Sequence, residues 1–186
     1  IEYAQMNLDQ DSIPIDYKLI AAKVISKEKG NVRNSFVLNR GLRHGVQKDF
    51  GVLSSHGVLG VVTSVNQEFC KVMTAMHTDF RLNVKILNSN EFGTLVWKPW
   101  TNNTYLMEGI GKYNPVTVGD TIITSGFSLI YPPNVPVGQI VNYKSNIDEG
   151  NITAEVELFQ EIQDVNYAYI LEQKISFSLD SLMINE

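Results

Sequence analysis

The sequence predicts an all-β protein built from two tandem, small β-barrels of about six strands each. Three observations support this: a passage that occurs twice, several segments that alternate apolar and polar residues, and glycines and prolines placed between those segments. The repeat comes first because it sets the architecture. Its copies are residues 45–62 and 118–141. Each contains a turn with glycine, a short apolar strand ending in serine, a second turn, and a strand with glycine near its start.

The first barrel is expected over residues 17–94, after a polar, irregular segment at residues 1–16 that we interpret as the end of a linker or of an upstream helix. Alternation with a period of two marks half-buried strands. The expected strands include residues 18–25, a face shared by Val32, Asn34, Phe36 and Leu38, the two short strands of the repeat, and residues 82–86.

The second barrel is expected over residues 95–172, followed by a C-terminal tail at residues 173–186. Its last strand could return to the first barrel. Segments rich in Val, Ile, Thr and Tyr favour strands. They lie at residues 93–97, which cross the predicted boundary, and at residues 104–110, 121–124, 152–158 and 167–171.

Glycine and proline divide these strands. Gly57 and Gly126 are placed in turns, where a positive φ is available to them. Gly60 and Gly138 occupy corresponding positions in the two copies, where a side chain would crowd a tightly packed strand. Adjacent prolines after Tyr131 cannot donate to a sheet, and they predict a longer bend there. Modules this small are best closed as barrels, because closure removes exposed strand edges.

Length and charge bound the function. The chain has 186 residues and no apolar run of the roughly 18 residues needed to cross a bilayer. It lacks a starting Met, so we expect it to be a piece of a longer protein. Residues 1–95 carry a net charge of +2 and residues 96–186 a net charge of −7. This polarity is typical either of two solvated faces or of a molecule that stacks head to tail.

No catalytic cluster stands out. Two tandem barrels are also the plan of chymotrypsin-like proteases, and His56, Asp79 and Ser125 occur in a suitable order. A triad is defined by geometry, however, and no glycine-rich oxyanion loop surrounds Ser125. A degenerate two-barrel serine hydrolase therefore stays as the alternative to a non-catalytic protein. No metal-ligand spacing and no phosphate-binding loop is present, so we predict neither metal nor cofactor.

The expected contacts are with proteins. The basic stretch at residues 18–48 has few aromatic residues, and the acidic second half would repel phosphate, so we expect no nucleic acid. Most aromatic side chains are interpreted as plugs of the barrel ends, but some lie in loops and are expected to stay partly exposed. The candidate contact residues are Lys27, Arg33, Trp97, Trp100, Tyr105, Phe127 and Tyr131.

Two ordered sets of motifs resemble the MreC family of bacterial rod-shape-determining proteins. The first is residues 39–46 followed by Gly57-Val-Leu-Gly-Val-Val62. The second is Val118-Gly-Asp-Thr-Ile-Ile-Thr-Ser-Gly126 followed by residues 131–140. The resemblance covers roughly residues 17–171. The polar tail and the aromatic loop at residues 97–105 have no counterpart in it.

The resemblance implies two small barrels that are periplasmic or extracytoplasmic, preceded by a coiled coil and by one membrane helix that anchors them to the inner (cell) membrane. It implies no catalysis. It implies a scaffold of the cell-elongation complex that contacts a class B penicillin-binding protein, the membrane proteins MreD and RodA, and the actin-like MreB. It also implies self-association into a homo-oligomer or a filament.

Overall fold

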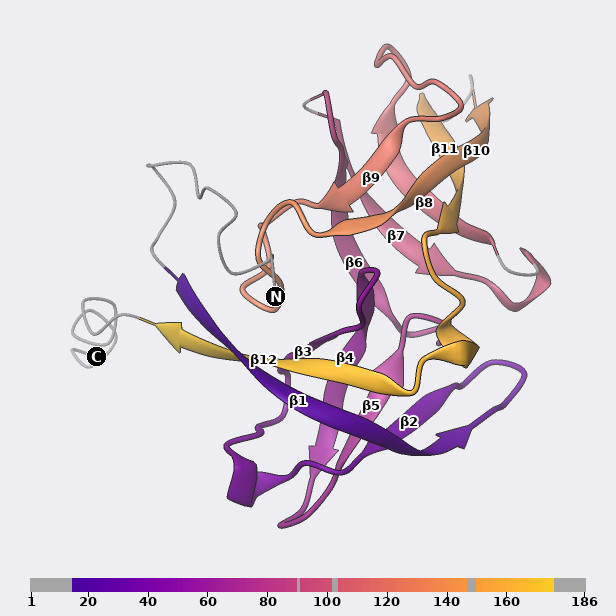
Figure 1. Cartoon of the computed structure of the whole chain (residues 1–186). Coiled ribbons are helices and arrows are strands. Elements are labelled where there is room, and N and C mark those ends of the chain that lie inside the picture. The colour runs from indigo at the N-terminus through magenta and orange to yellow at the C-terminus, as the bar shows by residue number, and fades with distance from the viewer. Residues whose placement is uncertain (1–14, 90, 102–103, 147–149, 176–186) are drawn as a thin grey trace, which may run out of the picture.

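The computed structural model describes residues 15–89, 91–101, 104–146 and 150–175, and Figure 1 shows two barrels, one above the other in this view. The predicted all-β class is confirmed. Most of the predicted linker at residues 1–16 and of the tail at residues 173–186 lies outside the described residues. In the described part of the chain the helices are single short turns, and none is long or apolar enough to cross a membrane.

Each barrel is closed and has six antiparallel strands. The first barrel has the order β1-β12-β3-β4-β5-β2, and the second has the order β10-β11-β8-β7-β6-β9. The first consists of β1 (Ile15–Glu28), β2 (Ser35–Leu38), β3 (Gly51–Leu53), β4 (Val58–Val65), β5 (Cys70–Thr74) and β12 (Tyr167–Ile175). The second consists of β6 (Arg81–Ile86), β7 (Phe92–Trp97), β8 (Thr104–Gly111), β9 (Thr121–Thr124), β10 (Pro136–Asn146) and β11 (Asn151–Leu158).

The boundary differs from the predicted one near residue 95. The chain leaves the first barrel after Thr74 and enters the second at Arg81. β6 pairs with both β7 and β9, so it closes the second barrel and cannot belong to the first. The sequence predicts residues 82–86 as a strand of the first barrel. The strand that closes the first barrel is instead β12, which pairs with β1 and β3. The last strand therefore returns to the first barrel.

The two barrels share one topology in permuted order. Matching β3, β4 and β5 with β9, β10 and β11 also matches β12 with β6, β1 with β7 and β2 with β8. The second barrel begins with β6, whereas the corresponding strand of the first barrel is β12, at the end of the chain. Because this strand lies far away in sequence, the first barrel closes only after the second has been synthesised. Such a long-range closure favours one coupled folding unit.

The registers place Gly60 and Gly138 at corresponding points of the repeat. Gly60 of β4 lies opposite Val52 and Thr74. Gly138 of β10 lies opposite Ile122 and Leu158. At both positions a Cβ atom would press on the backbone of the next strand. The sequence repeat is therefore a structural repeat at the level of individual residues.

The apolar side chains that alternate with polar ones along the strands fill the interiors of the two barrels. In β6 the side chains of Leu82, Val84 and Ile86 point inward, as the sequence predicts, and in β11 Ile152, Ala154 and Val156 do so. The buried apolar residues of both barrels join into one cluster. The cluster includes residues of the segments between the barrels, among them Phe80, Tyr131 and Ile162.

Candidate functional site

The junction between the barrels is the most elaborate region of the molecule. It is made where two chain crossings, residues 75–80 and 159–166, and one long loop, residues 125–135, meet the first barrel. The long loop follows β9 in the second copy of the repeat. In the first copy a tight turn of residues 54–57 stands at this place. The segment from Ile122 to Gly138 is eight residues longer than the equivalent one from Val52 to Gly60.

The extra residues reach across to the first barrel. Tyr131 is 4% exposed, and its hydroxyl donates a hydrogen bond to the carbonyl oxygen of Gly60. A Cβ atom on Gly51 would lie 2.5 Å from the carbonyl oxygen of Ile130 and 2.9 Å from the Tyr131 ring. Close approach is thus possible only because β3 begins with a residue that lacks a side chain. Tyr131 acts as a strut between the barrels.

Further contacts hold the long loop in place. Thr124 braces it from inside, since its hydroxyl donates to the carbonyl of Pro132 at 2.6 Å and accepts from the amide of Val135 at 2.9 Å. The carbonyl of Leu129 accepts hydrogen bonds from the Tyr17 hydroxyl, at 3.1 Å, and from the Gln173 side-chain amide. Both donors belong to the β1–β12 pair of the first barrel. The loop is therefore bonded to the second barrel through Thr124 and to the first barrel through Leu129.

The crossing at residues 159–166 is attached to the first barrel on two sides. The side chain of Gln160 donates to the carbonyl of Val58 at 2.7 Å and accepts from the Ser54 hydroxyl. Lys27 of β1 donates to the carbonyl of Gln163 at 2.7 Å, and Lys29 donates to the Gln163 side-chain oxygen at 2.8 Å. The crossing contains a single turn of helix over Ile162–Asp164, whose first residue is buried.

The structure separates the candidate contact residues into two groups. Trp97, Tyr105 and Tyr131 are at most 4% exposed and fill the interior or the junction, so they offer no surface to a partner. Trp97 and Tyr105 are direct neighbours across β7 and β8. Trp100 and Phe127 are 76% and 69% exposed. These two residues match the prediction that some aromatic residues in loops stay partly exposed.

The basic candidates also differ from each other. Lys27 holds the crossing and lies 5.5 Å from the centre of the Phe36 ring, so its role is structural. Arg33 is exposed, and the charge of its guanidinium is one of the influences that lower the pKa of His77, after burial of the imidazole. Phe127 stacks on Phe92 at 4.5 Å between ring centres, which leaves a paired aromatic surface on the second barrel.

Burial raises the pKa of the junction tyrosines. It raises the pKa of Tyr17 to about 12, and it raises the pKa of Tyr131 and Tyr105 further still. A tyrosine in the unfolded chain ionises near pH 10. Between about pH 10 and 12 the unfolded chain therefore releases protons that the folded chain keeps, and ionisation favours unfolding.

We expect the free energy of unfolding to be insensitive to these tyrosines below about pH 10 and to fall as the pH rises toward about 12. Urea denaturation at a series of pH values measures this. Tyr17→Phe should flatten the alkaline fall, whereas Tyr113→Phe, at a position that is 88% exposed, should not. Identical alkaline slopes in both variants would contradict the assignment.

The comparison with protein families decides what this architecture is. Residues 24–172 match the family described as "Rod shape-determining protein MreC, barrel core". The chain belongs to the MreC family. The match includes both barrels almost completely, from β1 to β12, and it contains both copies of the repeat.

Individual MreC proteins are distant relatives. The chain is 25% identical over 135 residues to the cell shape-determining protein MreC of Cereibacter sphaeroides, which covers 72% of this chain and 44% of the relative. It is 24% identical over 165 residues to that of Listeria monocytogenes, which covers 85% of this chain and 55% of the relative. The chain thus spans about half the length of these curated relatives.

Solved MreC structures share the fold. A structure of MreC from Listeria monocytogenes superimposes with a TM-score of 0.79 at 22% identity, covering 92% of this chain and 81% of the other. The MreC in a complex with the penicillin-binding protein PBP2 from Helicobacter pylori gives a TM-score of 0.68 at 14% identity, covering 87% and 99%. The two-barrel architecture is therefore that of MreC.

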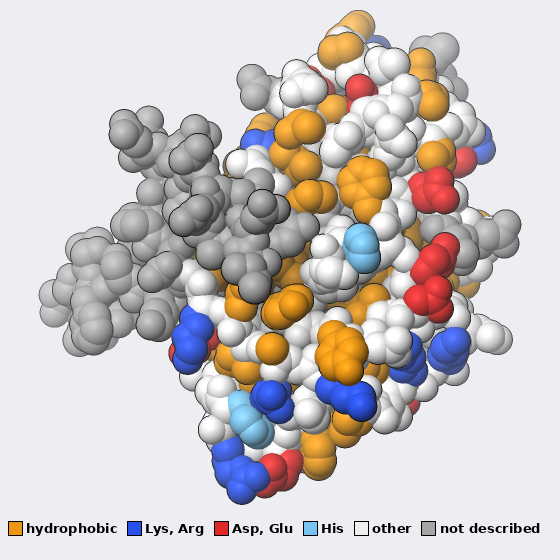
Figure 2. All heavy atoms as spheres, in the orientation of Figure 1, with side chains coloured by type: hydrophobic (Ala, Val, Ile, Leu, Met, Phe, Trp, Pro, Cys, Tyr) orange, Lys and Arg blue, Asp and Glu red, His pale blue; other side chains and the backbone are white. Residues whose placement is uncertain are grey.

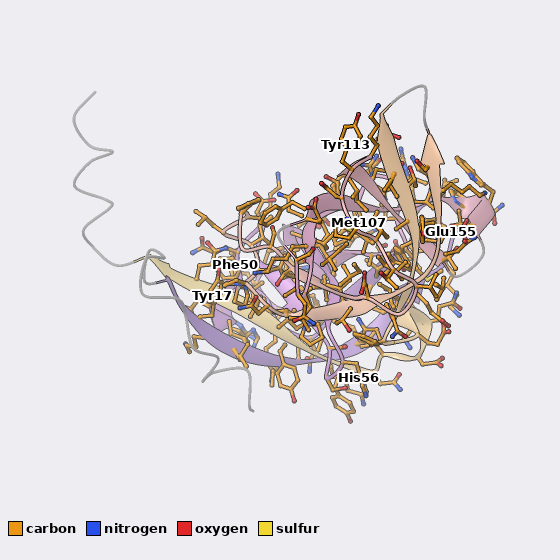
Figure 3. The ribbon with its side chains drawn as sticks, turned by 90° about the horizontal axis from the view of Figure 1, so that it is seen from above. Tyr17, Phe50, His56, Met107, Tyr113 and Glu155 are labelled. Atoms are coloured by element: carbon orange, nitrogen blue, oxygen red, sulfur yellow. The ribbon has the colours of Figure 1, made fainter. Side chains whose placement is uncertain are left out.

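The residues of the alternative hydrolase hypothesis do not form a triad in this MreC fold. Ser125 is 9% exposed, and its hydroxyl donates to the carbonyl of Asn83 at 3.2 Å and accepts from the amide of Phe127. The ring of His56 bonds to the Ser55 hydroxyl at 2.9 Å, and Figure 3 shows His56 at the edge of the molecule, away from the core. Asp79 lies 3.9 Å from the ring of His77. Each residue has its own partner, so the hypothesis loses its geometric basis.

Metal binding finds no support either. Within the described ranges, no three His, Cys, Asp or Glu side chains lie close enough together to hold a metal ion. Cys70, the lone cysteine of the chain, is buried at the start of β5, and burial raises the pKa of its thiol to about 12. It packs as a small apolar side chain.

Proposed function

We propose that the chain is the barrel part of a non-catalytic scaffold that supports lateral cell-wall synthesis and thereby maintains rod shape. The observation that carries this proposal is the family match over residues 24–172, joined to a closed two-barrel fold whose junction is built for rigidity. A rigid body with an exposed aromatic pair, Phe92 with Phe127, suits the holding of partners at fixed positions. The proposed location is outside the cytoplasmic membrane, with an anchor in the N-terminal region of the whole protein.

The proposed main partner is a class B penicillin-binding protein, because a protein of this fold forms a complex with PBP2 in Helicobacter pylori. MreD, RodA and MreB are proposed as partners of the whole protein, MreB through the region before the barrels. The test is binding of the purified chain to the class B enzyme of the same cell, measured by surface plasmon resonance. Absence of binding by a chain that is folded would overturn this partner assignment.

A non-catalytic role makes a prediction about Ser125. Replacement by alanine removes a hydroxyl with two local hydrogen bonds, which should cost about 0.5–1.5 kcal/mol of stability and no activity. Cells that carry Ser125→Ala in the whole protein should stay rod-shaped, and a fluorophosphonate probe should label neither form. Round cells at a normal protein level, or covalent labelling of the unmodified chain only, would favour the hydrolase instead.

Self-association is proposed through opposite charges. The basic stretch at residues 18–48 of one copy would face the acidic stretch at residues 145–173 of the next, a heterologous contact that forms filaments unless it closes into a ring. Exposed charges are screened beyond about 8 Å at physiological salt, so oligomers should dissociate as salt rises. Sedimentation velocity at low and high salt measures this.

The matched variant is Arg33→Glu/Lys48→Glu, which reverses two exposed charges and leaves Lys27 bound to the crossing. We expect it to shift the chain to monomers at low salt. Oligomers that persist or grow at high salt would instead indicate association through exposed aromatic residues such as Trp100 and Phe127.

A further inference from the structure

A histidine lies in one of the two crossings that connect the barrels. Residues 75–80 carry the chain from β5 of the first barrel to β6 of the second, and Figure 1 shows this passage between the lower and the upper barrel. His77 lies in the middle of this crossing, and its side chain is 12% exposed. Imidazole is the side chain whose charge ordinarily changes near neutral pH. The protonation state of His77 therefore bears on how the barrels are connected.

The ring of His77 shapes the crossing as a hydrogen-bond acceptor. Its Nδ1 atom accepts the backbone N–H of Asp79 at 3.0 Å, and the His77 carbonyl accepts the N–H of Phe80 at 3.0 Å. These two bonds close the turn that leads into β6. A ring nitrogen accepts a hydrogen bond only while it carries no proton. The observed turn therefore requires a ring without a proton on Nδ1.

The residues on either side of His77 attach the crossing to the first barrel. The carbonyl of Met76 accepts from the Asn34 side-chain amide at 2.6 Å. Thr78 donates twice to the carbonyl of Val32, from its amide at 3.1 Å and from its hydroxyl at 3.2 Å. The turn at His77 thus lies between these attachments and the start of β6, where a change of its shape alters how the second barrel is joined to the first.

Charged side chains from three segments act at this crossing. The carboxylate of Asp79 lies 3.9 Å from Nδ1 and favours a protonated ring. Burial of the imidazole and, to a smaller extent, the charge of Arg33 between β1 and β2 oppose protonation, so the pKa of His77 lies below its ordinary value. Arg81, at the start of β6, is bound to two carbonyls of the crossing at 2.7 and 2.8 Å, which keeps a further positive charge close by.

The other two histidines have different surroundings. His44 and His56 are exposed, and Figure 2 shows histidine rings that stand at the surface of the face turned to the viewer. His44 also accepts a backbone N–H through Nδ1, from Gly41 at 3.0 Å, but water has access to this exposed ring and can replace the bond. Of the three histidines, His77 is the one whose charged ring would be largely closed off from water, where burial of a charge is costly.

We propose that the crossing at residues 75–80 is a pH-sensitive connection between the barrels: a proton taken up from solvent by Nδ1 of His77 displaces the Asp79 N–H, opens the turn and loosens the attachment of the second barrel to the first. No covalent bond changes, so the step reverses when the pH rises. The switch does not depend on the function proposed above, and it can fail while the scaffold role stands. In a protein outside the cytoplasmic membrane, which is the proposed location, it would respond to the pH of the surroundings.

NMR titration of the unmodified chain tests the first step. We expect the Cε1 proton of His77 to titrate below about pH 6.5, the ordinary value for histidine, and the amides of residues 77–80 to shift at the same midpoint. At pH 5 the amides of residues 78–80 should also lose protection against hydrogen exchange, relative to about pH 7.5, because the turn opens.

Stability tests the consequence. The folded chain takes up fewer protons at His77 than the unfolded chain does, so the free energy of unfolding should decrease as the pH falls from about 7.5 to about 5. Urea denaturation at both pH values measures this loss.

His77→Asn is the matched variant. The side-chain oxygen of asparagine can accept the N–H two residues further on, as Nδ1 does, but it does not titrate. We expect the variant to lose less stability in acid than the unmodified chain and to keep its protection at residues 78–80. The control is His56→Asn, at an exposed position whose ring bonds to the Ser55 hydroxyl, and it should retain the full acid loss.

Three outcomes would overturn the proposal. The first is a titration midpoint of His77 at or above about pH 6.5. The second is an acid loss of stability in His77→Asn that equals that of the unmodified chain. The third is unchanged protection of residues 78–80 in acid, which would mean that the turn stays closed around a charged ring.

Discussion

Valine at Gly60 or at Gly138 should destabilise the chain by about 3 kcal/mol or more, at the upper end of what overpacking costs. A Cβ atom on Gly60 would press on the carbonyl oxygen of Met73 and lie 2.9 Å from the Cα atom of Thr74. A Cβ atom on Gly138 would press on the carbonyl oxygen of Glu157 and lie 3.0 Å from the Cα atom of Leu158. Backbone atoms of a closed barrel cannot move aside without breaking the sheet.

Urea denaturation of both variants measures the effect. The matched control is Gly111→Val, in which the new Cβ atom would meet only the end of the Asn114 side chain, at 3.1 Å. The control should lose much less stability. Because the two glycines occupy corresponding points of the repeat, their losses should agree within about 1 kcal/mol, which is the ordinary context dependence of overpacking. A loss at one glycine only would argue that the two copies differ in packing despite their shared register.

The fold could be predicted from sequence because its signals are local. The alternation of Leu82, Val84 and Ile86 with polar residues predicts a strand and shows which of its faces is buried. Glycine and serine at the strand ends predict the turns. Both signals act within a few residues. The division between the barrels is not local. β6 resembles any other strand, and its pairing with β9, about 40 residues away, closes the second barrel around it. The predicted boundary was displaced for this reason.

The candidate surface was harder to predict than the fold. Aromatic side chains fill a core and bind partners by the same apolar contacts, so composition alone could not separate Trp97 and Tyr105 from Trp100. One signal was available. Trp97 and Tyr105 fall inside strands, whereas Trp100 follows Pro99 and Phe127 follows Gly126 outside the strands. Gln160 had no signal at all, because its role depends on how the crossing passes the turn at residues 54–57.

The role of Tyr131 was missed because its partner belongs to the other barrel. The ring sits beside Gly51 and the hydroxyl donates to Gly60, and both glycines lie some 70–80 residues earlier in the chain. The second copy of the repeat carries the longer loop and the first copy carries the glycines that admit it. The differences between the copies, rather than their similarity, therefore build the junction.

Tyr131→Ala should be among the most damaging single changes in the molecule. It removes a ring that is 4% exposed from the cluster that joins the barrels, and such truncations cost about 3–5 kcal/mol. Tyr131→Phe keeps the ring and removes only the hydrogen bond to Gly60, which should cost about 1 kcal/mol. Phe127→Ala, four residues earlier but 69% exposed, is the control and should cost only about 0.5–1.5 kcal/mol, because it removes the stacking on Phe92 and no buried ring.

The position of Tyr131 also predicts how the chain unfolds. With the strut in place, both barrels should melt in one transition, since their buried residues form a single cluster and β12 closes the first barrel only after the chain has returned from the second. Without the ring, the barrels remain joined mainly by the two crossings, and calorimetry should show two overlapping transitions. A single transition at an unchanged temperature in Tyr131→Ala would contradict the role of Tyr131 as a strut. It would indicate that the contacts of Gln160 and Lys27 at the crossing couple the barrels instead.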